Sequence, residues 1–213
     1  MMTAEPVVAP RRVRLDGQRT RHQILDTAVR LATVEGLDGL SIGTLATATG
    51  ISKSGVYAHF ESKEDLQLAT VDTARDLFIA DVVAPAFASE GLARLRGLCE
   101  SFLRFVERRT LPGGCFFAAA AAELGGRQGP LKARVAANQR DWMRLLTDAA
   151  EEAVRGGELL ADTDVPMLVF ELNALVIAAN TAFLLQDDET PIARARAAAA
   201  RVISASVPSA EGG

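Results

Sequence analysis

Residues 50–66 read GISKSGVYAHFESKEDL, and this stretch decides how the N-terminal part of the chain folds. Gly50 tolerates the positive φ of a tight turn, and Ser52 can cap a helix that begins directly after it. Ser41 can cap a helix on the other side of the turn in the same way. Ala46 is expected at the close crossing of these two helices, and Leu45, Ile51 and Val56 are expected to form the small core between them. The spacing therefore predicts a helix-turn-helix, although an ordinary pair of packed helices with a glycine turn has the same spacing.

The second helix of this pair has small side chains on its outward face. Successive residues of a helix turn by about 100°, so Val56 and Phe60 share its inward face. Ser54, Gly55 and Ala58 then face outward. A helix with a narrow outer face can enter the major groove of DNA deeply, with its N-terminal residues nearest the base edges. This face is therefore a candidate for reading DNA.

Helical patterns also fill the chain on both sides of this unit. Apolar residues recur at helical spacing from about Gly17 to Glu35, and Ser62 can cap a further helix that runs to about Ile79. Downstream, proline and glycine predict breaks at Pro85, 112–114, 125–130, 156–157, Pro166 and Pro191. No segment alternates polar and apolar residues as a half-buried strand does. We therefore expect an all-α protein of about nine helices.

Charge is distributed unevenly along the chain. Residues 1–63 contain 8 basic and 6 acidic residues, a net charge of +2, whereas residues 64–213 have a net charge of −6. The arginines that cluster around the start of the first predicted helix are Arg11, Arg12, Arg14, Arg19 and Arg21. A basic arm suits the phosphate backbone of DNA, while a solubilising tail has the same composition. We expect residues 1–15 to form such a flexible basic arm.

Cysteine content and hydropathy favour the cytoplasm. The chain has two cysteines, Cys99 and Cys115, too few for a disulfide-stapled secreted domain. We expect both to be small buried hydrophobes, and a redox pair is the alternative. The most apolar window, 165–185, is interrupted by one glutamate and two asparagines, so we expect a buried helix and no membrane association.

Signs of catalysis are weak. His22 and His59 are the only histidines, and neither a metal-ligand spacing nor a nucleophile motif is present. The glycine-rich stretch 125–129 lacks the spacing of a phosphate-binding loop. We therefore expect no enzyme activity, no metal site and no cofactor.

Residues 50–66 resemble the DNA-binding signature of the TetR family of bacterial transcriptional regulators, chiefly through the Tyr, His-Phe and Ser-Lys elements within 57–63. The resemblance is close over about residues 19–66, and further on the chain is similar only in length and helical content. It implies contacts with bases or phosphates from Ser41, Thr44, Lys53, Ser54, Gly55, Tyr57, His59 and Lys63. Some members have a base-reading arginine in the second helix, where this chain has Gly43. Without that arginine, recognition of the DNA sequence would depend on Lys53, on the arm or on DNA shape.

A regulator of this kind needs a second, largely apolar site for a small molecule. The helices after residue 80 supply the candidate lining: Phe102, Phe105, Cys115, Phe116, Phe117, Glu123, Asn138, Trp142, Phe170 and Asn173. Phenylalanines at helical spacing also fit an ordinary core, and Glu123 also fits a solvent-exposed helix end. The helix predicted over 62–79 is the expected link between the two sites because it joins them along the chain.

The last two predicted helices, 164–186 and 191–207, have long apolar or small-residue surfaces. Similar proteins pair two copies of these helices in a four-helix bundle, so we expect a homodimer on a roughly palindromic site in double-stranded DNA. The expected organisation is an arm at 1–15, a three-helix DNA-binding domain at 16–63, and a ligand-binding and dimerisation domain at 64–213. The resemblance implies a cytoplasmic repressor that a small hydrophobic effector releases from its operator. An activator or an effector-independent regulator of the same fold is the alternative.

Overall fold

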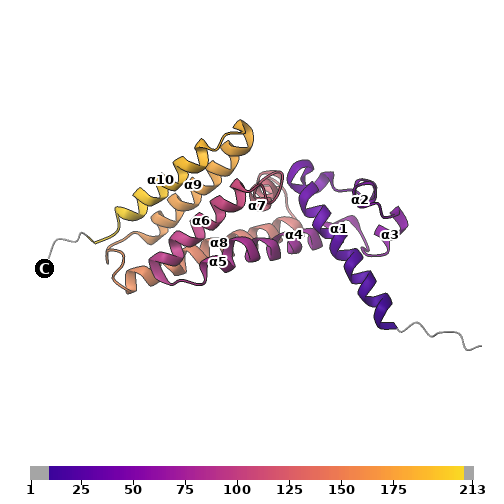
Figure 1. Ribbon diagram of the computed structural model, residues 1–213, viewed down its shortest axis with the longest axis horizontal. Coiled ribbons are helices and arrows are strands. Elements are labelled where there is room, and N and C mark those ends of the chain that lie inside the picture. Colours follow the sequence, from indigo (N-terminus) through magenta and orange to yellow (C-terminus); the bar gives the residue numbers. More distant parts are fainter. Residues whose placement is uncertain (1–9, 209–213) are drawn as a thin grey trace, which may run out of the picture.

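The computed structural model describes residues 10–208, and every regular element in this range is a helix. The elements in chain order are α1 (Pro10–Gly39), α2 (Ile42–Thr49), α3 (Lys53–Tyr57), α4 (Lys63–Phe78), the π-helical turn η1 (Ile79–Val83), α5 (Ala84–Ala86), α6 (Gly91–Glu107), α7 (Phe116–Leu124), α8 (Pro130–Arg155), α9 (Val165–Gln186) and α10 (Thr190–Ser204). Apart from the three-residue α5, nine α-helices make up the described part of the chain, which confirms the all-α prediction. Figure 1 shows an elongated molecule with α1, α2 and α3 at one end and α9 and α10 at the other.

The short helices at the N-terminal end begin and end where local chemistry predicts. Ser41, Ser52 and Ser62 each precede a helix and accept a hydrogen bond from the backbone N–H three residues later. Gly50 ends α2 with a φ of 70°, a left-handed conformation that favours glycine. The predicted capping residues are therefore confirmed.

The first helix is longer than predicted and is broken near its end. α1 begins at Pro10, inside the stretch 1–15 that was expected to form an arm. Proline suits a first helical turn because its missing N–H needs no partner there. Gly36 interrupts the helix with a φ of 77°, and one more turn follows up to Gly39. The side chains of Arg11, Arg12 and Arg14 lie outside the described residues, and their role at phosphates stays a prediction.

The prediction of a helix break at Pro85 is wrong, because the helix ends only after Ala86. α4 continues without interruption through η1 and α5, and Pro85 lies inside α5. Proline lacks an N–H, and its ring clashes with a carbonyl of the preceding turn in a regular α-helix. The wider π-helical turn of η1 precedes it, and such turns relieve a local mismatch without ending the helix. The chain therefore runs as one long helix from Lys63 to Ala86.

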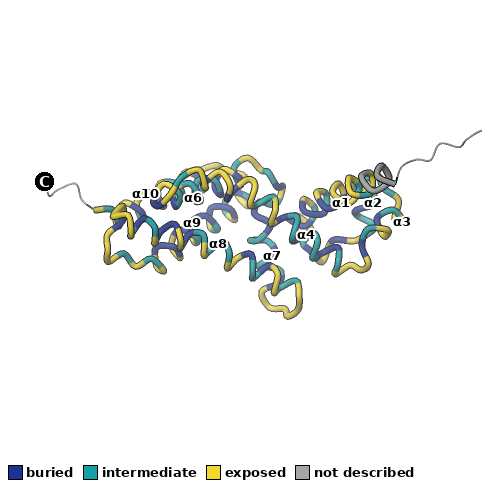
Figure 2. Tube along the Cα trace, turned by 90° about the horizontal axis from the view of Figure 1, so that it is seen from below, coloured by how far each residue is buried: buried dark blue, intermediate teal, exposed yellow. Residues whose placement is uncertain are grey.

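The larger part of the molecule is a bundle of α6, α8, α9 and α10, against which α4 and α7 pack (Figure 1). Figure 2 shows buried residues along the inner faces of these helices and exposed residues along their outer faces. Arg196 of α10 forms ion pairs with Glu100 and Glu107 of α6. Its hydrogen bonds lower the pKa of the Glu107 carboxyl group, so the charged pair is favoured. These contacts hold α10 against the bundle.

The long apolar helix α9 is only partly covered. By length and composition alone it is apolar enough to cross a membrane. In the structure it packs in the bundle, where Leu172, Val176 and Phe183 are buried. Only 39% of its most apolar stretch is buried, however. A large apolar surface of α9 therefore faces outward.

Candidate DNA interface and ligand cavity

The helix-turn-helix has a buried core and an open outer face. Leu45 of α2 and Val56 of α3 are fully buried, and Phe60 completes the same core. The guanidinium carbon of Arg21 in α1 lies 5.2 Å from the centroid of the Phe60 ring, a cation–π contact that joins α1 to this core. The packing fixes the angle between α2 and α3, so the outer face of α3 is presented as one surface.

One hollow on this surface brings together half of the predicted DNA contacts. It has a volume of ≈ 310 Å³ and is lined by Ser41, Ile42, Gly43, Lys53, Tyr57, Lys63 and Leu66. The Tyr57 side chain is 64% exposed, so it adds little to the core. The Lys63 ammonium donates a hydrogen bond of 2.6 Å to the backbone carbonyl of Asp38. Lys53, Lys63, Tyr57 and Ser41 thus line one hollow between α2, α3 and α4.

The other four predicted contacts lie at the same end of the molecule but outside this hollow. The hydroxyls of Thr44 and Ser54 are within hydrogen-bond distance of the capping serines of their helices. Gly55 and His59 are half-buried. The contacts of all eight residues with DNA stay predictions.

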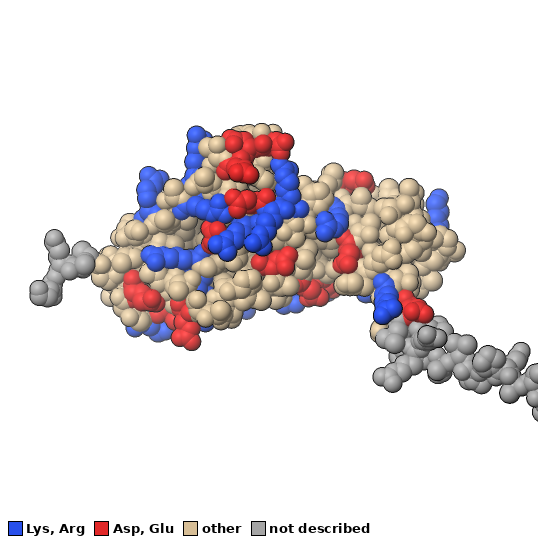
Figure 3. Space-filling view, in the orientation of Figure 1, with Lys and Arg blue, Asp and Glu red and all other residues tan. Residues whose placement is uncertain are grey.

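Charged side chains are sparse around the helix-turn-helix. On the face seen in Figure 3, basic and acidic side chains interleave over the bundle, while the end formed by α1, α2 and α3 shows few of either sign. The described basic residues of that end, outside the two histidines, are Arg19, Arg21, Arg30, Lys53 and Lys63. Affinity for a polyanion at this end therefore depends on few cations rather than on a broad basic field.

A larger cavity lies in the bundle between α4, α6, α7, α8 and α9. Its volume is ≈ 910 Å³, which is within the range of sites for drug-sized ligands. Its lining includes six of the ten candidates predicted from the sequence: Phe102, Cys115, Phe117, Asn138, Trp142 and Asn173. That this cavity binds a small molecule stays a prediction.

The aromatic wall of this cavity is centred on Phe78 of α4. The Phe78 ring centroid lies 5.3 Å from that of Trp142, 6.0 Å from that of Phe117 and 6.2 Å from that of Phe102, all with edge-to-face geometry. Sequence reasoning considered only the helices after residue 80 and missed Phe78. Its position four residues after the buried Ala74 is the signal that could have found it.

Polar groups of the cavity are few. The indole Nε1 of Trp142 donates to Asn173 Oδ1 at 3.0 Å, and the Asn138 amide donates to the Arg134 carbonyl at 3.0 Å. The charged residues in the lining are Arg75, Asp141, Arg144 and Asp148, two of each sign. The cavity therefore combines an aromatic wall with three side-chain amides, Asn138, Gln139 and Asn173, and has no excess of either charge.

Four of the predicted lining residues lie elsewhere. Phe105 and Phe116 are buried in the core, with exposed fractions of 5% and 3%. Phe170 is 64% exposed on the uncovered face of α9. Glu123 accepts hydrogen bonds from the backbone N–H groups of Leu37 and Asp38, at the end of α1. Helical period alone could not distinguish these environments from the cavity wall.

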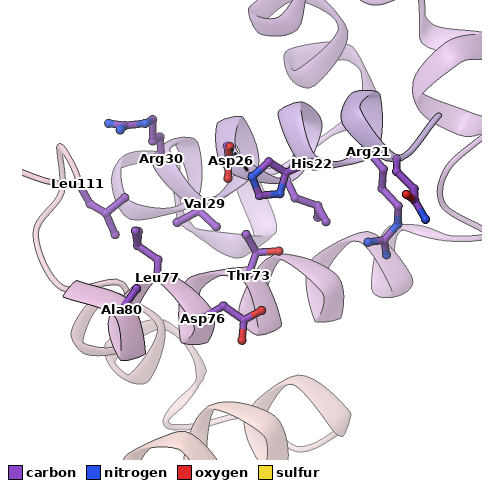
Figure 4. A pocket seen from close by; sticks show the side chains of 12 residues that line it. Arg21, His22, Asp26, Val29, Arg30, Thr73, Asp76, Leu77, Ala80 and Leu111 are labelled. Atoms are coloured by element: carbon purple, nitrogen blue, oxygen red, sulfur yellow. Dashed lines mark ion pairs between the residues drawn. The ribbon is translucent and has the colours of Figure 1, made fainter. Parts of the chain in front are cut away.

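A further groove separates α1 from α4 where the two parts of the molecule meet. It has a volume of ≈ 710 Å³, and Figure 4 shows Val29, Leu77 and Leu111 on its apolar side. His22 and Asp26, whose side chains lie 3.4 Å apart, belong to its polar rim. The groove lies between helices that pack against each other, and polar contacts such as the hydrogen bond from Leu37 N to Glu123 also join the two parts at this junction.

Both cysteines are free and buried. Burial, with a smaller contribution from the Glu100 charge, raises the pKa of the Cys99 thiol to about 12. Burial likewise raises the pKa of Cys115, which lines the cavity. Reactive redox cysteines have a lowered pKa, so both thiols match the expectation of small buried hydrophobes.

The fold and the two sites define a helix-turn-helix transcription factor with a separate cavity of ligand size. The family model described as "Bacterial regulatory proteins, tetR family" matches residues 24–70, and the model described as "Tetracyclin repressor-like, C-terminal domain" matches residues 91–199. The chain belongs to the TetR family. It is therefore a DNA-binding transcriptional regulator of a non-enzymatic family.

Curated relatives match over only part of the chain. The HTH-type transcriptional regulator AcrR of Shigella flexneri is 39% identical over 56 residues, which is 26% of each chain. The HTH-type transcriptional activator FasR of Mycolicibacterium smegmatis is 30% identical over 95 residues, 44% of this chain and 43% of its own length. The chain thus spans about a quarter to under half of the length of these relatives.

Solved structures match over nearly the whole chain. A TetR transcriptional regulator from Chloroflexus aurantiacus superposes with a TM-score of 0.84 at 27% identity, covering 91% of this chain and 98% of that one. AibR, solved in complex with isovaleryl coenzyme A and operator DNA, superposes with a TM-score of 0.66 at 22% identity, covering 89% and 98%. The likeness to AibR shows a shared fold.

Proposed function

We propose that the protein is a cytoplasmic, ligand-responsive transcriptional repressor that a small hydrophobic effector releases from a roughly palindromic operator. The main observation behind this proposal is that α4 runs from the helix-turn-helix to the ligand cavity. Lys63 at its start lines the hollow of the helix-turn-helix, and Phe78 at its end lines the cavity. One helix therefore touches both sites, as coupling between DNA binding and ligand binding requires.

The lining of the cavity supports a hydrophobic or amphipathic effector. Four aromatic rings can cover an apolar body, and the amides of Asn138 and Asn173 can orient one or two polar groups on it. The cavity lining contains two arginines and two aspartates, so it favours neither an anionic nor a cationic effector. AibR, which binds isovaleryl coenzyme A and operator DNA, supports the idea that this fold accommodates both kinds of partner.

An uncovered apolar stripe on α9 supports a homodimer. Its exposed residues recur every three or four positions: Met167, Phe170, Ala174, Ala178, Thr181 and Leu185. The small residues at its centre let a second helix approach closely, and the larger residues at both ends pack around the crossing. A two-fold axis brings the same stripe from each copy together and places the two reading helices about one DNA turn, ~34 Å, or a multiple of it apart.

Replacing Phe170 with aspartate is expected to break this dimer. The substitution puts a charge into an interface that would otherwise exclude water, at a position that is already 64% exposed within one chain. Sedimentation equilibrium should show a dimer for the wild-type protein and a monomer for the variant at the same concentration. Val34→Asp is the matched control, because Val34 is 66% exposed on α1. A variant that stays dimeric places the interface elsewhere.

Titration with DNA tests the proposed function. The purified protein is titrated with DNA from the region upstream of its own gene and with a scrambled sequence, at 50 mM and 200 mM salt. We expect preference for the native region, two chains per site, and a loss of at least about tenfold in affinity at the higher salt as counterions return to the phosphates. Equal binding of both DNAs at every salt concentration argues against sequence-specific regulation by this helix-turn-helix.

The relative FasR, which is described as an activator, supports the alternative direction of regulation. A reporter gene behind the bound DNA separates the two. Deletion of the regulator should raise reporter expression if the protein is a repressor and lower it if the protein is an activator.

A further inference from the structure

The two faces of α7 meet different parts of the molecule. Phe117, Ala118 and Ala121 line the ligand cavity. Glu123 comes two residues after Ala121, a rotation of about 200° around the helix, so it lies on the opposite side. α7 also packs against α1, and Figure 1 shows it beside the end of that helix. A single short helix therefore contacts both the cavity and the DNA-binding part.

The Glu123 carboxylate binds the backbone of α1 with both of its oxygens. Its Oε2 accepts a hydrogen bond of 2.7 Å from Leu37 N, and its Oε1 accepts one of 2.9 Å from Asp38 N. Both N–H groups follow the break at Gly36, where one more helical turn begins. A carboxylate at the start of a helical turn satisfies free N–H groups and is favoured by the helix dipole. Hydrogen bonds of this charged kind are stronger than neutral ones.

Gly36 allows this contact because it has no side chain and adopts a left-handed backbone conformation. Its φ of 77° favours glycine, and a Cβ atom at this position would lie 2.9 Å from Glu123 Oε2. A larger residue would therefore strain the backbone and crowd the carboxylate. The sequence and the backbone thus agree on a close approach between α7 and the end of α1.

The same turn of α1 is bound by α4 and leads directly into the helix-turn-helix. Gln67 of α4 donates to the Leu37 carbonyl at 2.8 Å in a buried position, and Lys63 donates to the Asp38 carbonyl. Two residues after Gly39, Ser41 caps α2. A displacement of residues 36–39 would therefore change the position of α2, and with it that of α3.

We infer that Glu123 is a coupling residue: it transmits occupancy of the ligand cavity through α7 to the end of α1 and so to the DNA-reading helices. This inference rests on the proposed function, because it assigns a route for the regulation of the same cavity. A ligand against Phe117, Ala118 and Ala121 pushes on α7, and the two carboxylate bonds pass that shift to Leu37 and Asp38. The cavity is then connected to the helix-turn-helix by two routes, the long helix α4 and the shorter path through α7 and Glu123.

The test uses a filled cavity in place of the unidentified effector. Ala118→Trp puts a large side chain into the cavity, and Ala121→Phe is the second variant should the first fail to fold. Each is combined with native Glu123, with Glu123→Ala and with Glu123→Gln, which keeps one acceptor oxygen. Glu158→Ala is the matched control, because Glu158 accepts a bond of 3.0 Å from the Leu92 backbone N–H at the start of α6, far from α1. Operator affinity and hydrogen exchange of the Leu37 and Asp38 amides are measured for each protein.

With native Glu123, and in the Glu158→Ala control, filling the cavity should weaken operator binding by about 5- to 150-fold and speed exchange of the two amides. In the Glu123→Ala protein the effect of filling on operator binding should fall to about twofold or less, and Glu123→Gln should lie between. Equal weakening with and without Glu123, or unchanged exchange at Leu37 and Asp38 when the cavity is filled, overturns the inference. Faster exchange at these amides that is not accompanied by any change in operator binding supports the link through Glu123 and instead counts against the proposed repressor function.

Discussion

Replacing Tyr57 with phenylalanine and Lys53 with alanine is expected to weaken operator binding by about 5- to 150-fold each, since contacts of this kind contribute ~1–3 kcal/mol. Both side chains line the hollow between α2 and α3, and both are exposed, so neither change should unfold the protein. Tyr57→Phe removes only the hydroxyl group that can donate to a phosphate. Lys53→Ala removes the cation at the N-terminal turn of α3, which lies nearest the base edges when such a helix enters the major groove.

The two variants should differ in specificity, which fluorescence anisotropy with operator and scrambled DNA can measure. Loss of a phosphate contact weakens binding to operator and scrambled DNA about equally. Tyr57→Phe should therefore preserve the ratio of the affinity for the operator to the affinity for scrambled DNA. Loss of a base contact weakens binding to the operator more than binding to scrambled DNA, so Lys53→Ala should lower that ratio. Lys132→Ala is the matched control, because it removes the same charge from α8. Operator affinities within twofold of wild type for both variants would place the reading surface elsewhere.

Replacing Gly113 with alanine is expected to destabilise the junction between the bundle and the helix-turn-helix. Gly113 lies in the loop between α6 and α7, where its N–H donates to Thr33 Oγ1 at 3.0 Å. A Cβ atom at Gly113 would overlap the backbone carbonyl oxygen of Thr33. Neither partner is a flexible side-chain end, so the loop or α1 must move. Overpacking of this kind costs about 1–3 kcal/mol in unfolding free energy.

Thermal unfolding followed by circular dichroism measures this effect. A loss of 1 kcal/mol lowers the Tm of a chain of this size by ~2–4 °C, so a decrease of several degrees is expected. Gly126→Ala is the matched control, because a Cβ at Gly126 has no neighbour within 4 Å. If both variants melt at the wild-type temperature, the loop is free to withdraw from α1 without loss of stability.

The helix-turn-helix could be predicted from the sequence because its determinants are local. A serine cap bonds an N–H three residues away, and Gly50 meets the backbone demand of its own turn. The same local rules misplaced the break at Pro85. Proline is unfavourable in the interior of a regular α-helix, but the π-helical turn η1 precedes Pro85 and the long helix continues, and nothing within a few residues of Pro85 indicates that outcome.

The cavity could be predicted only in part. Helical period shows that Phe102 and Trp142 point inward, and both line the cavity. Phe105 and Phe116 have the same period and are buried in the core instead. Which inward residues pack against each other and which border an open space depends on how helices far apart in the sequence meet.

By itself the sequence determined most of the helices, their caps, the outward face of α3 and the family, since each of these depends on residues within a few turns of one another. Only the tertiary structure decided that Phe78 is the centre of the cavity wall, that Phe170 lies on an uncovered face of α9, and that Glu123 binds Leu37 and Asp38. Glu123 and the two N–H groups it binds are more than eighty residues apart in the chain. A carboxylate after an apolar run fits a ligand site, a solvent-exposed end or a helix cap equally well, and the neighbour that packing brings to it decides which one it forms.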